Sequence, residues 1–179
     1  MATMPAMASR FFRGKPSGDD GPEHESILSP HRIVVPVRGD LCDKDALRAA
    51  CRLAQPSKAD ILVITVLEVA RSLPLSASLG DELGRAEEML AEMELVAAKL
   101  GTKVQTTVLQ AREAGPAVVD EARRWGADLM VVGLELKPRF GEFSLDRAAS
   151  DLLSHAQCRL ILIRQAMPEA PSTEPGASS

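Results

Sequence analysis

The sequence predicts a single α/β domain in which helices cover a parallel sheet. Five short apolar runs alternate with four segments of helical periodicity along the chain, a pattern typical of parallel strands joined by crossover helices. With four Phe, one Trp and no Tyr, the core has to be built from aliphatic side chains and methionine, which suits such a sheet. At 179 residues, one domain is expected.

The first strand is predicted at His31–Arg38, and Pro36 near its end marks the place where ladder bonding stops. A helix capped near Asp43 follows, with alanines and leucines at helical spacing, and Pro56 is expected to end it. The second strand, Ala59–Val69, is apolar enough to be central in the sheet.

The longest predicted helix runs from about Asp81 to Leu100, and Gly101 supplies its stop. The alternating segment Lys103–Gln110 predicts a strand nearer the edge of the sheet. A third helix then extends to Trp125, with Pro116 in its first turn and Gly126 past its end.

The stretch that closes the domain contains the predicted ligand site. Asp128–Val132 is a buried strand, Ser144 stands in the position of a helix cap after a polar loop, and the helix continues to His155. The apolar run Leu160–Ile163 completes a parallel crossover. Because loops at the carboxyl ends of parallel strands form the ligand crevice, any small-molecule site is expected around Gly133–Arg147.

Residues 30–165 are predicted to fold, with a disordered arm over residues 1–29 and a disordered tail over residues 166–179. In the arm, basic residues flank Phe11 and Phe12, a pattern that could form a short anchor for a partner or a membrane surface, but a solvated tail is the favoured interpretation.

Bulk properties exclude several functional classes. The net charge of −4 and the absence of a basic patch argue against nucleic-acid binding. The three cysteines form no CxxC pair, so neither a disulfide framework nor a zinc site is expected. No apolar run reaches the roughly 20 residues that span a bilayer, and we expect a cytoplasmic protein.

Four pieces of the sequence together resemble the universal stress protein family: IVVPV followed by RGD and ALRAACRLA, LVITVLEV, GPAVVDEARRWGADLMVVG, and SDLLSHAQCRLILIR. The resemblance covers nearly all of His31–Arg164. It implies a Rossmann-like open sandwich whose five-stranded parallel sheet has the order 3-2-1-4-5 and four helices. It also implies a homodimer paired through the last strand, Leu160–Arg164, whose apolar edge independently favours pairing.

The segment LEVARSLPL and the helix after it more loosely resemble forms of this domain found alone or as cytosolic tails of amino-acid permeases. That likeness makes a membrane transporter a candidate protein partner.

Family members that bind ATP share an aspartate closing the first strand, a G-x-x-G after the fourth and, after nine intervening residues, Gly followed by Ser or Thr. Glycines let backbone amides reach phosphate oxygens, and the hydroxyl donates a further bond. Here these positions hold Arg38, Gly133, Leu136, Asp146 and Arg147, so only Gly133 is kept. The resemblance therefore predicts that the chain does not bind ATP.

Two interpretations of the crevice stay open. In one, a basic group attracts ATP, AMP or another anion, with Val66 and Gly133 lining a base pocket. In the other, these are exposed loop charges, and an ion pair between Arg38 and Asp146 keeps the crevice closed. The basic group consists of Arg38, Lys137, Arg139 and Arg147.

No catalytic set assembles from the sequence. The three histidines, His24, His31 and His155, lie apart along the chain, and no nucleophile elbow or metal-binding spacing is present. We therefore predict a non-enzymatic, homodimeric stress-response or regulatory docking domain, in which Phe140 and Phe143 plug the crevice or contact a partner. The alternative function is a nucleotide or anion sensor.

Overall fold

The computed structural model describes residues 29–75, 79–134, 137–139, 142–144 and 146–164. Its elements are β1 (Arg32–Pro36), α2 (Asp43–Ser57), β2 (Asp60–Glu68), α3 (Gly80–Lys99), β3 (Gln105–Ala111), α4 (Ala114–Trp125), β4 (Leu129–Leu134), β5 (Lys137–Arg139), β6 (Glu142–Ser144), α5 (Arg147–His155) and β7 (Arg159–Arg164).

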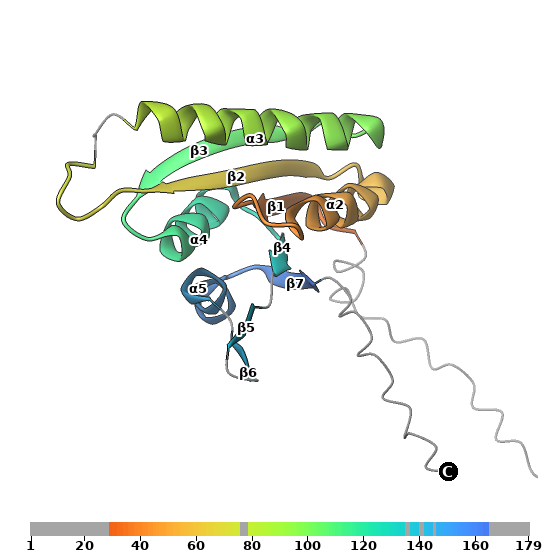
Figure 1. The fold of residues 1–179 in the computed structure, drawn as a ribbon. Coiled ribbons are helices and arrows are strands. Elements are labelled where there is room, and N and C mark those ends of the chain that lie inside the picture. Colours follow the sequence, from red (N-terminus) through yellow and green to blue (C-terminus); the bar gives the residue numbers. More distant parts are fainter. Residues whose placement is uncertain (1–28, 76–78, 135–136, 140–141, 145, 165–179) are drawn as a thin grey trace, which may run out of the picture.

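The main sheet has five parallel strands in the order β3-β2-β1-β4-β7. The predicted α/β class and the order 3-2-1-4-5 are confirmed. As predicted, β2 lies inside the sheet and β3 lies at one edge, while β7 is the last strand at the other. Figure 1 shows α2 and α3 on one side of the sheet and α4 and α5 on the other.

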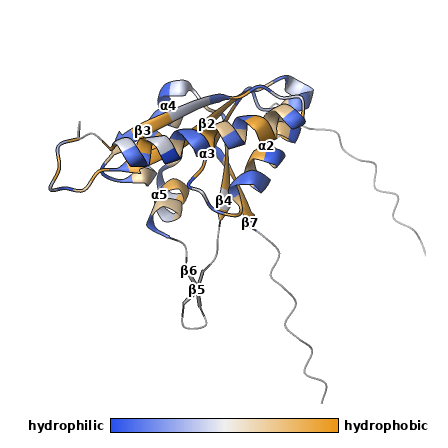
Figure 2. Cartoon of the chain, turned by 45° about the horizontal axis from the view of Figure 1, so that its top comes forward, coloured by the Kyte–Doolittle hydropathy of each residue, from blue (hydrophilic) through white to orange (hydrophobic). Residues whose placement is uncertain are grey.

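Two cores sandwich the sheet because successive side chains of a strand point to opposite faces. Ile33 and Val35 pack with residues of α2 and α3, whereas Val34, between them, packs with residues of α4 and α5. The buried residues of α3, among them Leu90 and Met93, belong to the first of these cores, and Figure 2 shows hydrophobic and hydrophilic residues alternating along this helix. An unbroken apolar run such as that of β1 therefore supplies side chains to the cores on both faces of the sheet.

Several predicted boundaries match the structure. β1 ends at Pro36, and Gly126 caps α4 with a φ of 73°, in the left-handed region that favours glycine. Helix α2 continues one residue past Pro56 to Ser57, so Pro56 lies in the last turn, where its missing N–H removes one intrahelical hydrogen bond.

The loop between β4 and α5 differs from the prediction. Its described parts form an antiparallel hairpin of β5 and β6, where a polar loop was expected. Ser144 lies in β6, and the cap of α5 is Asp146, whose carboxylate accepts a hydrogen bond of 2.7 Å from the N–H of Ala149. Asp146 rather than Ser144 caps the helix because it stands three residues before Ala149, the spacing at which a cap side chain reaches a free backbone N–H.

Both predicted tails lie outside the described residues, apart from residue 29 of the arm. Within the described ranges, no helix combines the length and apolar character needed to cross a membrane.

Candidate functional site

A cavity of about 730 Å³ opens at the carboxyl ends of the strands. Its walls come from the ends of β1 and β2, from α3, from the β3–α4 junction and from the start of α5. Its charged lining residues are the arginines Arg38, Arg71, Arg85, Arg112 and Arg147 and the carboxylates Glu68, Glu82, Glu113, Asp146 and Asp151. The described charges of the lining are therefore balanced.

Three of the predicted site residues, Arg38, Val66 and Arg147, line this cavity. Lys137 and Arg139 belong to β5, but their side chains lie outside what the structure describes. The same holds for the side chain of Phe143 in β6, and Leu136 and Phe140 lie outside the described residues altogether.

Gly133 serves close packing in this structure. A Cβ at this position would lie 2.8 Å from the carbonyl carbon and oxygen of Cys42, at the start of α2. The neighbouring contact is also tight, because the thiol of Cys42 donates a hydrogen bond of 3.1 Å to the carbonyl of Leu134. The one glycine kept from the nucleotide motif thus has a structural reason to be there.

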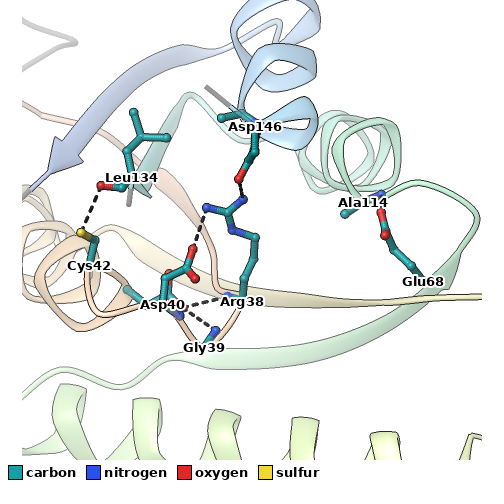
Figure 3. Close-up of polar contacts among 10 residues, drawn as sticks. Arg38, Gly39, Asp40, Cys42, Glu68, Ala114, Leu134 and Asp146 are labelled. Carbon is teal, nitrogen blue, oxygen red and sulfur yellow. Dashed lines mark hydrogen bonds and ion pairs between the residues drawn. The ribbon is translucent and has the colours of Figure 1, made fainter. Parts of the chain in front are cut away.

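Arg38 forms the predicted ion pair with Asp146, and its guanidinium also lies 2.7 Å from Asp40 (Figure 3). Burial by itself lowers the pKa of Arg38, but the hydrogen bond and charge of Asp146, together with the charges of Asp40 and Asp43, raise it above the usual value. The expected pair is confirmed. Both residues also line the cavity, and the role of this pair in closing the crevice stays a prediction.

Asp43 fills a ring of backbone amides after β1. Its Oδ2 accepts hydrogen bonds of 2.8, 2.8 and 2.9 Å from the N–H groups of Arg38, Gly39 and Asp40. The side chain is buried, and its Oδ1 has no hydrogen-bond partner among the described residues. Burial raises the pKa of Asp43, although the three amide bonds oppose that rise.

The N-termini of the two helices beside the cavity are also occupied by carboxylates. Glu68, at the end of β2, accepts a hydrogen bond of 2.7 Å from the N–H of Ala114 in the first turn of α4 (Figure 3). Asp146 plays the same part at Ala149 in α5. Converging amides and helix N-termini are the groups that bind external anions, and here the chain's own side chains bind them.

The β3–α4 junction holds the loop that follows β2. Arg112 donates hydrogen bonds to the carbonyls of Val69 at 3.1 Å, Ala70 at 2.5 Å and Leu73 at 2.8 Å. Its neighbour Glu113 accepts hydrogen bonds from Arg147 of α5 and Arg71 of the loop.

Sequence reasoning missed the β2 and β3 side of the site, namely Glu68, Arg71, Arg112 and Glu113. The signal was available, because all strands are parallel and their carboxyl ends meet at one edge. Attention to the charged residues after every strand, and not only after β4, identifies them. No group of three or more His, Cys, Asp or Glu that could hold a metal is found in the described ranges.

Residues 30–164 match the profile of the Universal stress protein family. A universal stress protein of Methanocaldococcus jannaschii is 25% identical over 140 residues, which cover 75% of this chain and 82% of that protein. Among solved structures, a universal stress protein from Archaeoglobus fulgidus superimposes with a TM-score of 0.64 at 21% identity, over 74% of this chain and 97% of the other. Its complex with dAMP gives 0.60 at 22% identity, over 74% and 96%.

Proposed function

The chain belongs to the universal stress protein family, and on this premise we propose that it is a regulatory docking domain that acts without catalysis. In this proposal it does not hold ATP through the glycine motif of the family, and it works as a homodimer. A membrane transporter stays a predicted partner.

One observation carries the proposal on ATP: carboxylates of the chain occupy the backbone amides that a phosphate would need. Asp43 accepts hydrogen bonds from the amides after β1, and Asp146 accepts one from the amide of Ala149 in the first turn of α5. A triphosphate would have to displace Asp146 from both Ala149 and Arg38. Bringing several negative charges beside a carboxylate costs further Coulomb energy, so the affinity of a typical micromolar site would not be reached.

We expect millimolar ATP to leave the melting temperature of the protein unchanged, because a ligand at concentration c stabilises the folded state by RT ln(1 + c/Kd), which is close to zero when Kd far exceeds c. Restoring the motif with Arg38→Asp, Leu136→Gly, Asp146→Gly and Arg147→Ser is expected to create an ATP-dependent rise. Differential scanning fluorimetry compares the two proteins. Saturable binding of ATP by the unaltered chain, with amides of residues 133–147 shifted in NMR spectra, would defeat the proposal.

The proposal on the dimer is supported by the position of β7 at the end of the sheet, with β4 as its neighbour on the inner side. An edge strand presents backbone groups that can pair with another chain. Leu162, on this strand, is a large apolar residue that is 40% exposed. Pairing of two such edges would cover it.

Leu162→Asp is therefore expected to convert the dimer to a monomer, since it places a charge in the paired surface. Native mass spectrometry reports the subunit count. The matched control is Leu153→Asp, because Leu153 is similarly exposed, at 46%, but lies on α5. A monomeric unaltered protein, or a Leu162→Asp variant that stays dimeric, would contradict this surface.

A second candidate function, a nucleotide or anion sensor, is favoured by the cavity itself. Its volume of about 730 Å³ falls in the range of small-molecule sites, and five arginines line it. A protein of the same fold was solved in complex with dAMP. In this alternative the ligand lies on the arginine side of the cavity, beside Val66 and Arg147.

A further inference from the structure

We propose that Arg71, Arg112 and Arg147 form a subsite for one anionic group, a phosphomonoester or a carboxylate, and that the carboxylate of Glu113 stands in for that group. The proposal deepens the second candidate function and rests on it. It names the ligand class as small molecules that carry a single such group.

Two arginines from distant parts of the chain meet at one oxygen atom. Oε1 of Glu113 lies 2.9 Å from Nη2 of Arg147, at the start of α5, and 3.4 Å from Nη2 of Arg71, in the loop after β2. Two guanidinium groups that converge on one carboxylate oxygen are arranged as they would be around a ligand anion.

The stand-in is easily displaced. The side chains of Arg71 and Arg147 are 88% and 75% exposed, and that of Glu113 is 30% exposed. Ion pairs this exposed contribute little to stability, so an incoming anion gives up little by replacing Glu113. By contrast, the Asp43 carboxylate is buried and bound by three amides, and exchange there would cost far more.

Arg112 adds a positive charge next to this pair. Its described hydrogen bonds go to the neutral carbonyls of Val69, Ala70 and Leu73, on either side of Arg71. A guanidinium forms a stronger hydrogen bond with an anion than with a neutral carbonyl oxygen. A ligand phosphate or carboxylate would therefore compete with these three carbonyls for Arg112. Arg112 also lines the cavity, as Arg71, Glu113 and Arg147 do.

The remaining walls define the ligand further. Val66, Ala86 and Met89 line the cavity and offer an apolar surface for the rest of the ligand. The equal number of carboxylates and arginines in the described lining disfavours a ligand with several negative charges. A single acidic group attached to an apolar or neutral body matches both conditions.

The test is an NMR titration of the full chain at constant ionic strength with inorganic phosphate, acetate, AMP and ATP. We expect saturable shifts at the amides of residues 71–73, 113 and 147 with phosphate and AMP or with acetate, and weaker binding of ATP. Tighter binding of phosphate and AMP than of acetate would identify the ligand group as a phosphomonoester, and the reverse order would identify it as a carboxylate.

Glu113→Gln keeps the size of the side chain and removes the stand-in charge, so it is expected to tighten phosphate or acetate binding about two- to fivefold, the equivalent of one exposed ion pair. Arg71→Gln and Arg147→Gln are expected to weaken it by a similar factor. The control is Arg48→Gln, which removes an equally charged residue paired with Asp45 on α2 and should leave binding unchanged.

Shifts that do not saturate, or an affinity unaffected by Glu113→Gln, would overturn the subsite. Failure of the sensor function looks different, because then none of the four probes binds anywhere in the cavity. Binding of AMP with shifts confined to residues 133–147 would refute the subsite while supporting a sensor.

Discussion

Gly133→Ala is expected to lower the free energy of unfolding by about 1–3 kcal/mol, the usual cost of overpacking a core. The added Cβ would meet the backbone carbonyl of Cys42 at 2.8 Å, closer than real Cβ contacts come. Neither side can move easily, because β4 is hydrogen-bonded between β1 and β7 and Cys42 precedes the first turn of α2. Urea denaturation measures the change.

Gly84→Ala is the matched control. Gly84 lies inside α3, and a Cβ there would have no atom within 4 Å. Alanine reduces the backbone freedom of the unfolded chain, so this variant should gain about 0.5–1 kcal/mol. Equal effects of the two substitutions, or no loss at Gly133, would show that this glycine is not required for packing against Cys42.

Asp43→Ala is expected to destabilise the protein by about 1–3 kcal/mol, because it removes the buried carboxylate that is the acceptor of three backbone N–H groups. Asp43→Asn should cost less, since its amide oxygen can accept the same bonds. The two variants are compared by urea denaturation at neutral pH. A loss as large for Asn as for Ala would indicate that the negative charge, and not the acceptor, holds the loop.

A comparison of the unaltered protein with Asp43→Asn also tests how the stability depends on pH. Because burial raises the pKa of Asp43, the folded state keeps this proton at pH values where the unfolded chain has lost it. The contribution of Asp43 to stability is therefore largest below its unfolded pKa, about 3.9, and declines as the pH rises through the folded value. Relative to Asp43→Asn, the unaltered protein should thus become less stable between these two pKa values as pH increases. An opposite slope in the difference would mean that the three amide bonds outweigh the cost of burial.

The fold could be predicted from the sequence because its signals are local and repeated. The run around Ile33 and Val34 is apolar on both faces, which a strand covered by helices on both sides requires. Gly126 and Pro116 mark the ends of α4 for reasons contained in their own backbones. The start of α5 was predicted wrongly because two residues that are good helix caps, Ser144 and Asp146, stand close together there.

The site could be predicted only in part because its partners are far apart in the chain. The substitution of the nucleotide motif is visible in the sequence, and the pairing of Arg38 with Asp146 follows from their charges. That Glu68 reaches the amide of Ala114, or that Glu113 joins Arg71 to Arg147, depends on the placement of loops that sequence periodicity does not specify. The packing role of Gly133 likewise needs the position of Cys42.

The internal carboxylates have a consequence for how such a sequence can change. Each of Asp43, Glu68 and Asp146 now completes a loop or a helix end, so removing any one of them weakens the native state before any ligand contact is regained. Against a total stability of about 5–15 kcal/mol, a few such steps would exhaust the margin. Removal of any of these carboxylates therefore lowers stability, and a nucleotide-binding variant that lacks one of them would start with a smaller stability margin than the present sequence.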